Sequence, residues 1–453
     1  MSVPAEGPPP PPPDDPRPPP PSAKLRSRAT ARARAWWDRP LTSYYVLVVS
    51  AGLLLVVGLV MVLSATTIKS YLKTGSPYAY FQKQLLWAAI GLVAFWIGLV
   101  LPVRMYRLMA YPLLVLSFLG LFAVLLPGVG ITANGSTRWI GVGGVNFQPS
   151  EVAKLALALW GADLLVRKRR LLRHWKHLLV PLLPVASLIF ALVMFEPDLG
   201  TTICLLLVVL GLLFVIGTPL RVFAALWVAI LGAVVLLIAI EPYRLARITG
   251  FLGGAGKDPS DTGYQATQGL YSLSSGGLWG VGLGASRGKW GHVPNAYTDY
   301  IFAIIGEELG LAGCLAVLAL FGAFAYAGIR IARRSVDPFV RLVAASCTIW
   351  LAGQTFINIG AVVKLLPITG IPLPLISFGG TSLMLTMFVI GMLATFARHE
   401  PEAATYLRAR GRTRWAKVFG LPLPAPPPEP RRHRARRPPA AARGSPTRRQ
   451  EAR

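Results

Sequence analysis

The chain has 453 residues, of which 54% are hydrophobic and only 14% are charged. A soluble chain carries about 25% charged residues, so this composition excludes an ordinary soluble domain. The net charge of +27 would suit a nucleic-acid-binding protein. However, the basic residues lie in the two tails and in alternate short connections, where the positive-inside rule requires them. We therefore predict contact with anionic membrane lipids and no nucleic-acid partner.

Hydropathy predicts an all-α polytopic membrane protein with about ten transmembrane helices. A helix needs about 20 apolar residues to cross the hydrocarbon core. The expected spans are 44–65, 81–101, 108–127, 150–167, 178–195, 199–217, 220–240, 300–328, 340–363 and 376–397. Together they form a transmembrane domain over residues 41–398.

The flanking segments and the charges fix the expected orientation. Residues 1–40 are Pro-rich and then basic, and residues 399–453 are basic, so both are predicted to be disordered tails. Because positive charge recurs at alternate connections, both termini are expected in the cytoplasm. The long outer loop 241–299, between the seventh and eighth helices, is expected to be ordered, partly helical and close to the chemistry.

The first polar cluster stands where the fourth expected span begins. Arg138 and Gln148 precede the helix, Ser150 is a candidate N-cap, and Glu151 and Lys154 are three residues apart and share a helix face. A capped helix with an interfacial ion pair would explain them. An ionisable residue at membrane depth is nevertheless a functional candidate, and we favour that interpretation for Lys154.

The second cluster is the tight connection Glu196-Pro197-Asp198. A turn in which Asp198 caps the next helix explains it, and two carboxylates that bind a cation or orient a basic group explain it equally well. Both interpretations stay open.

The third cluster ends the long loop, where Lys289 precedes Thr298 and Asp299 at the start of a span. A carboxylate near water but flanked by an apolar helix is typical of an acid–base residue. Taken alone, a simple N-cap is the better explanation of Thr298 or Asp299. Two turns further on, Glu307 and Glu308 lie inside the span, and at least one of them needs a partner.

The fourth cluster runs from 366 to 382, includes Ser377, and contains three prolines and three glycines. Irregular backbone at membrane depth is tolerated where it is buried or lines a cavity, so this segment predicts a cavity wall. The three cysteines show neither metal spacing nor a disulfide framework and are interpreted as packing residues. The glycine-rich stretch 280–284 follows no strand, which argues against a dinucleotide site.

Taken together, these clusters resemble the SEDS family (shape, elongation, division and sporulation) over residues 40–402. The motifs that carry the resemblance are Gln148-Pro-Ser-Glu-x-x-Lys154, Pro197-Asp-Leu-Gly200, Gly263-Tyr-Gln265, Pro294-x-x-x-Thr-Asp299, Glu307-Glu-x-Gly310 and Pro374-x-Ile-Ser377-x-Gly-Gly380. The segment 397–403 is most similar to the actinobacterial FtsW branch of the family. Family members often have His where this chain has Tyr297, a difference expected to alter packing more than chemistry.

The resemblance implies a peptidoglycan glycosyltransferase that polymerises lipid II, a disaccharide-pentapeptide on undecaprenyl diphosphate, by inverting transfer. The family's catalytic aspartate falls on Asp299, the expected general base. One carboxylate suffices because diphosphate is already a good leaving group, whereas glycosidases need a pair. The expected substrate-binding residues are Arg138, Gln148, Glu151, Lys154, Asp198, Gln265, Lys289, Glu308 and Ser377; of these, Arg138, Lys154 and Lys289 supply positive charge for the diphosphate.

The resemblance also implies partners and a location. It implies a class B penicillin-binding protein (an FtsI-like transpeptidase), FtsQ-, FtsL- and FtsB-like division regulators, and a plasma-membrane position at the septum. No metal ligands are assigned, and help from a divalent cation (Mg²⁺ or Mn²⁺) stays open. An elongation polymerase of the RodA type and a lipid II flippase remain alternatives; a transporter predicts charges along a two-sided pathway, whereas these candidates gather on the outer side.

Overall fold

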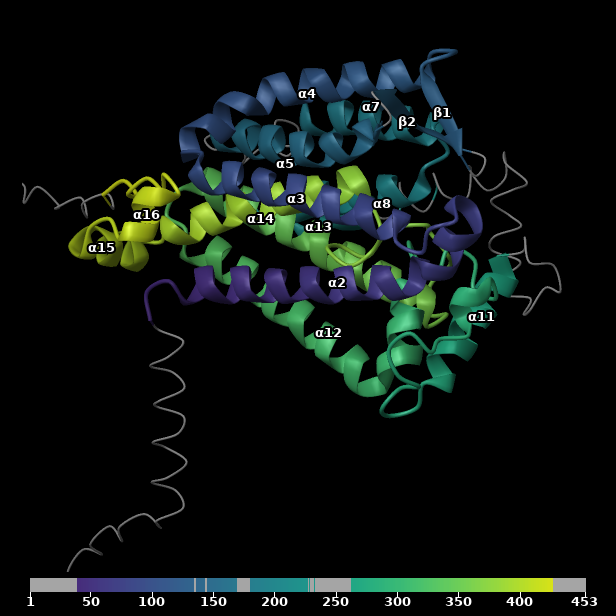
Figure 1. Ribbon diagram of the computed structural model, residues 1–453. Coiled ribbons are helices and arrows are strands. Elements are labelled where there is room, and N and C mark those ends of the chain that lie inside the picture. The colour runs from purple at the N-terminus through teal and green to yellow at the C-terminus, as the bar shows by residue number, and fades with distance from the viewer. Residues whose placement is uncertain are drawn as a thin grey trace, which may run out of the picture.

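The computed structural model describes residues 39–133, 136–142, 145–168, 180–226 and 262–426, with the single positions 228 and 232. Its helices run side by side in a bundle (Figure 1). A small sheet and helix α11 lie at one end of this bundle, here called the sheet end. Helices α15 and α16 lie at the opposite end, here called the tail end.

Long apolar helices form the bundle, as the hydropathy predicts. The bundle helices are α2 (Thr42–Thr74), α3 (Ala79–Val100), α4 (Val103–Leu125), α5 (Pro149–Arg167), α7 (Leu182–Phe195), α8 (Leu199–Val215), α12 (Ile301–Arg334), α13 (Pro338–Val362) and α14 (Gly380–Arg398). Helix α11 (Thr262–Ser275), at the sheet end, is short and polar. Within the described ranges, α2, α3, α4, α12, α13 and α14 are long and apolar enough to cross a membrane. The mostly helical, polytopic fold is confirmed, and the number of ten spans stays a prediction. The expected span 220–240 falls largely outside the described residues.

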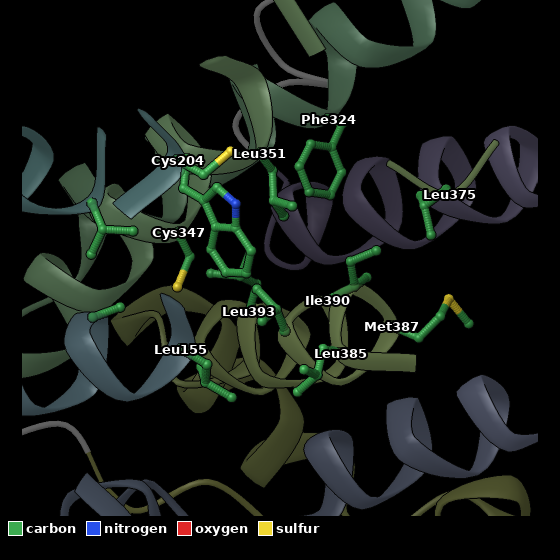
Figure 2. Close-up of a cluster of buried hydrophobic side chains, with 14 of the residues drawn as sticks. Leu155, Cys204, Phe324, Cys347, Leu351, Leu375, Leu385, Met387, Ile390 and Leu393 are labelled. Carbon is green, nitrogen blue, oxygen red and sulfur yellow. The ribbon is translucent and has the colours of Figure 1, made fainter. Parts of the chain in front are cut away.

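The core lies where α5, α8, α12, α13 and α14 meet (Figure 2). Cys204 and Cys347 point into it among leucines, and Leu155 and Leu393 face them from α5 and α14. All three cysteines are free and buried, so their interpretation as packing residues is confirmed. Nearly all of α5 is buried, which places Glu151, Lys154 and Asp163 inside the protein, whereas Arg167 at its end is exposed.

The expectation of an all-α protein is wrong in one place. The connection after α4 forms a three-stranded antiparallel sheet of β1 (Gly130–Ala133), β2 (Ser136–Val142) and β3 (Val145–Phe147). Its register pairs Gly130 with Ile140 and Ile140 with Phe147. β-Branched and aromatic residues recur along this connection, and such residues favour strands. The segment was too short for hydropathy to separate it from a loop.

The expectation that disorder begins at residue 399 is also wrong. Helix α15 (Pro401–Arg410) and helix α16 (Arg414–Val418) follow α14 and fold against the tail end of the bundle (Figure 1). Buried Arg398 donates a hydrogen bond to the carbonyl of Pro422 at 2.9 Å, and Trp96 of α3 donates to the carbonyl of Phe419 at 3.0 Å. The arginines that made the segment look solvated are therefore partly used as donors to backbone carbonyls.

Helix α12 is broken at Gly310, whose φ of 67° and ψ of −167° are not helical. The segment after α11 fills this break, and its Gly280 lies against the interrupted backbone. A Cβ placed on Gly310 would lie 2.4 Å from the nitrogen of Gly280. Position 310 therefore requires glycine both for its positive φ and for this close approach.

We expect Gly310→Ala to lower the thermal stability of the protein clearly. The left-handed conformation costs a non-glycine residue about 1–2 kcal/mol, and the contact with Gly280 adds to that cost. Gly322→Ala is the matched control, because Gly322 lies on the same helix and a Cβ there meets nothing within 4 Å. Thermal unfolding in detergent measures both variants, and equal melting temperatures would show that the break is not a constraint.

Candidate active site

Asp299 lies in the last turn of the long loop and is half-buried. Helix α12 starts two residues later at Ile301, with Tyr300 as its N-cap and no side-chain capping bond. Neither Thr298 nor Asp299 is therefore the N-cap of α12, which removes the simplest structural explanation for this carboxylate. The hydroxyl of Thr298 donates to Oδ1 of Asp299 at 3.1 Å, which orients the carboxylate.

The backbone around Asp299 is held by α13 and by the segment before α14. Asn358 of α13 donates to the carbonyl of Asp299 at 2.8 Å and to that of Ile371 at 2.7 Å. The hydroxyl of Ser377 donates to the carbonyl of Thr298, and the N–H of Phe378 donates to the carbonyl of Tyr297 at 3.0 Å. Three consecutive carbonyls, those of residues 297–299, are thus fixed from outside the loop.

Ser377 and Gln265 act on this loop through its backbone. Besides donating to Thr298, the hydroxyl of Ser377 accepts the N–H of Leu373 at 2.8 Å. Gln265 of α11 is buried and donates to the carbonyl of Pro294 at 3.1 Å. In this conformation both predicted substrate-binding residues position the Asp299 loop, and their contact with substrate stays a prediction.

Lys69 is a candidate that the sequence analysis missed. Its ammonium donates to the hydroxyl of Tyr297 at 2.8 Å and lies 4.4 Å from the centre of that ring. The expected first span ended at residue 65, but α2 continues to Thr74 and carries Lys69 to the Asp299 loop. The replacement of the family's usual His by Tyr297 was the available signal, because a phenol at this position can accept a hydrogen bond from a cation.

Lys289 and Glu308 form a buried ion pair beside this loop. Lys289 Nζ lies 3.5 Å from Oε1 of Glu308, and the two side chains are 7% and 0% exposed. Ser64 of α2 donates to the same oxygen at 2.6 Å. The neighbouring Glu307 accepts the hydroxyl of Ser286 and the N–H of Arg287, both at 2.7 Å. Glu307 and Glu308 therefore both have partners, and the charge of Lys289 is neutralised by Glu308 in this conformation.

A second group of predicted residues gathers between the sheet and α8. Asp198 is the N-cap of α8 and accepts the N–H of Thr201 at 3.0 Å, which confirms the capping interpretation, one of the two left open for this connection. Arg138 of β2 lies 3.5 Å from the carboxylate of Asp198 and donates to the carbonyl of Pro197 at 3.1 Å. Gln148 Nε2 lies 3.3 Å from the same carboxylate. The sheet therefore positions Arg138, whose side chain remains 20% exposed.

The start of α5 differs from the expectation. Gln148 is the N-cap position and no side chain caps the helix, so the prediction that Ser150 is the cap is wrong. The helix already begins at Pro149, so Ser150 lies inside it. The hydroxyl of Ser150 instead accepts a hydrogen bond from the side-chain amide of Gln148 at 3.1 Å. Further along, Lys154 bonds Glu151 at 2.8 Å, and their side chains are 2% and 4% exposed.

One face of α13 connects the two groups. Lys154 Nζ lies 4.8 Å from the centre of the Trp350 ring, and Trp350 donates to Oε1 of Gln354 at 2.9 Å. Gln354 donates to the carbonyl of Pro372 at 2.8 Å, and Asn358 follows one turn later. Residues four apart share a helix face, and eight residues of helix rise about 12 Å. The residues around Lys154 and the residues around Asp299 are thus separate, but both contact this face of α13.

Glu196 is buried next to Asp198, and neither of its carboxyl oxygens has a hydrogen-bond partner among the described residues. Residue 196 lies in the connection between α7 and α8. Burial, and secondarily the charge of Asp198, raise the pKa of this carboxyl to about 9. Glu196 therefore keeps its proton at neutral pH, which agrees with its lack of donors.

We expect Glu196→Gln to remove part of the pH dependence of stability. The folded protein holds this proton between the ordinary carboxyl pKa and about 9, whereas the unfolded chain does not. The free energy of unfolding of the wild type therefore falls as pH rises through this window. We expect the melting temperature of the variant, relative to that of the wild type, to increase as pH rises from 5 to 9. A constant difference between the two proteins would contradict the raised pKa.

Metal ligands do not gather in this site. Among the described residues no three His, Cys, Asp or Glu side chains come together as a candidate metal group. No metal centre is assigned, and a divalent cation stays an expectation.

The fold and the site describe a polytopic helical membrane protein with a positioned carboxylate at the sheet end. The family profile for the cell cycle proteins FtsW, RodA and SpoVE matches residues 44–402. The chain therefore belongs to this family, the SEDS family. The residue clusters had predicted this membership, and it is confirmed.

Known relatives cover most of the chain. It is 45% identical over 426 residues to the probable peptidoglycan glycosyltransferase FtsW of Mycobacterium tuberculosis, over 93% of this chain and 81% of the relative. It is 38% identical to stage V sporulation protein E of Bacillus subtilis, over 78% of this chain and 96% of the relative.

Solved structures with this fold include RodA of Thermus thermophilus, at a TM-score of 0.58 and 26% identity, covering 81% of this chain and 99% of that one. Another is a chain from a study of polymerization and crosslinking by a peptidoglycan synthase complex, at a TM-score of 0.60 and 28% identity, covering 75% of this chain and 97% of that one.

Proposed function

We propose that this chain is a peptidoglycan glycosyltransferase that polymerises lipid II into glycan strands during cell division. The observation that carries the proposal is the placement of Asp299. Asp299 is not the N-cap of α12, and the backbone of residues 297–299 is held by α13 and by the segment before α14. The names of the mycobacterial and other FtsW relatives support the same activity.

Asp299 is the general base in this mechanism. The 4-hydroxyl of one sugar attacks the anomeric carbon of another, the bond to diphosphate breaks, and the hydroxyl proton passes to the carboxylate of Asp299. The configuration at the anomeric carbon inverts because one displacement occurs. Thr298 and Asn358 orient the base through their bonds to its carboxylate and its carbonyl. Holding the base in place lowers the cost of reaching the reactive geometry.

The departing diphosphate needs positive charge. Lys69 lies against Tyr297, two residues from the base, and Arg138 keeps part of its guanidinium exposed. We propose these two as the side chains that meet the diphosphate first. Lys289 and Lys154 are each paired with a glutamate, so their contact with substrate requires those pairs to open.

The membrane arrangement belongs to the same proposal. We place ten spans in the plasma membrane with both termini in the cytoplasm and the sheet end outside. Basic residues near the tail end, such as Arg333 and Arg334 at the end of α12, support this orientation. The polyprenyl chain of the substrate then stays in the outer leaflet while its sugars reach Asp299.

The proposed partners follow from the family. We propose a class B penicillin-binding protein as the crosslinking partner, supported by the similarity to a chain from a peptidoglycan synthase complex. Division regulators of the FtsQ, FtsL and FtsB type and a septal location belong to the same proposal. The higher identity to FtsW relatives than to the solved RodA supports division over elongation.

The test uses the full chain, purified with its penicillin-binding partner and given fluorescent lipid II in lipid vesicles. We expect ladders of glycan strands on a gel. Movement of lipid II across vesicles without any polymer would support the flippase alternative and overturn the proposal. Adding a chelator, then Mg²⁺ or Mn²⁺, measures the cation requirement in the same assay. A fluorescent fusion in dividing cells separates a septal role from a side-wall role.

A further inference from the structure

The segment between α11 and η2 (Gly288–Trp290) has a composition unlike that of an exposed loop. Every residue from 276 to 285 is either apolar or glycine, and no charged residue occurs from 262 to 286. Water-facing loops are normally polar because their backbone and side chains are solvated. This segment therefore needs another explanation.

The backbone of this segment is paired with the broken helix α12. The N–H groups of Val281 and Gly282 donate to the carbonyls of Glu307 and Glu308 at 2.9 and 3.1 Å. In return, the N–H groups of Leu311 and Ala312 donate to the carbonyls at positions 277 and 278, at 2.9 and 3.2 Å. The segment thus satisfies the polar groups that the break at position 310 would leave free.

The apolar side chains point away from the protein. Leu278 is 65% exposed, Trp279 83% and Leu283 60%. On the adjoining face of α12, Leu311 and Leu315 are also exposed. The exposed surface of the segment therefore continues the apolar face of a helix long enough to span the membrane.

The break lies well inside α12 and not at its end. The break lies nine residues after the start of α12 at residue 301, which is about 13 Å along a helix. Non-helical backbone is compatible with hydrocarbon only where its N–H and C=O groups are paired internally. The pairing with α12, the absence of charge and the outward apolar side chains all meet this condition.

We propose that residues 277–284 form a re-entrant segment inserted among the lipid acyl chains of the leaflet at the sheet end. Lipid is the occupant because the segment is continuous with the exposed apolar face of α12. Glu307 and Glu308 hold the segment through their carbonyls and hold residues 286–289 through their carboxylates. The insertion therefore sets the depth at which the Lys289–Glu308 pair sits relative to the membrane surface.

Spin labels in the full-length chain test the insertion. Trp279→Cys and Leu283→Cys each receive a nitroxide in a phospholipid bilayer without any partner protein, and the three native cysteines are buried. Leu116→Cys, exposed in the middle of α4, is the hydrocarbon reference. Thr132→Cys, exposed on β1, is the aqueous reference. Unlabelled protein measures background from the native cysteines, and melting temperatures check that each variant folds.

We expect both labels to collide more often with oxygen than with a water-soluble nickel complex, as at position 116, and the order to reverse at position 132. Labels that collide mainly with nickel would place the segment in water and overturn the proposal. Labels protected from both reagents would show a protein surface, a second copy or another part of the chain, as the occupant, and would also overturn it. Two labelled positions prevent one misfolded variant from deciding the result.

Discussion

Asp299→Asn is expected to reduce lipid II polymerisation by about 10²–10⁴-fold, the usual contribution of a positioned general base. The amide keeps the size of the carboxylate and can still accept the hydroxyl of Thr298, but it cannot take a proton at neutral pH. Substrate binding should change little, because the loop is held through backbone carbonyls. Initial rates at several lipid II concentrations separate the loss in kcat from any change in KM.

The control for this variant is Glu402→Gln, which removes an exposed carboxylate at the tail end. It should polymerise lipid II at the wild-type rate. Comparable melting temperatures for both variants and the wild type would exclude misfolding. If correctly folded Asp299→Asn keeps the wild-type rate, Asp299 is not the base.

Lys154→Met is expected to lower the free energy of unfolding by about 3–5 kcal/mol, the cost of leaving one member of a buried ion pair alone. Its partner Glu151 would keep a buried carboxylate without its cation. The double variant Glu151→Gln/Lys154→Met should recover much of this loss, because no uncompensated charge remains. Chemical or thermal unfolding of Lys154→Met, Glu151→Gln and the double variant gives the coupling between the two residues.

The same variants distinguish a structural role of Lys154 from diphosphate binding. If Lys154 acts on the substrate, the double variant regains stability but stays slow in polymerisation, with a raised KM. If Lys154 only balances Glu151, polymerisation recovers together with stability. A Lys154→Met protein as stable as the wild type would contradict the buried pair itself.

The sequence predicted the helical bundle well because hydrophobic length is a local property. Apolar runs predicted the six long apolar helices found among the described residues. The three-stranded sheet was missed because short strands leave no run of comparable length. The ordered segment after residue 399 was missed because charge suggested solvation, whereas Arg398 and Arg408 bond backbone carbonyls.

The candidate site was only partly predictable, because a sequence shows a charge but not its partner. The motifs placed Asp299 at a helix boundary, and the structure agrees. The three-residue spacing of Glu151 and Lys154 did indicate their ion pair. However, nothing local could show that Lys289 is neutralised by Glu308. Lys69 reaches Tyr297 across 228 positions of sequence, and its contribution depends on how far α2 extends. Packing between distant helices decides these contacts, and no single segment encodes it.

The packing of α15 and α16 moves the practical boundary of the domain. A chain cut after α14 would lose the Pro422 carbonyl that Arg398 bonds and the Phe419 carbonyl that Trp96 bonds. A purification tag or a fluorescent fusion attached at residue 398 would then replace these partners and leave Arg398 and Trp96 without the carbonyls that they bond. Truncations and fusions are better joined after Pro424, whose carbonyl accepts a hydrogen bond from Arg408 of α15 at 2.8 Å.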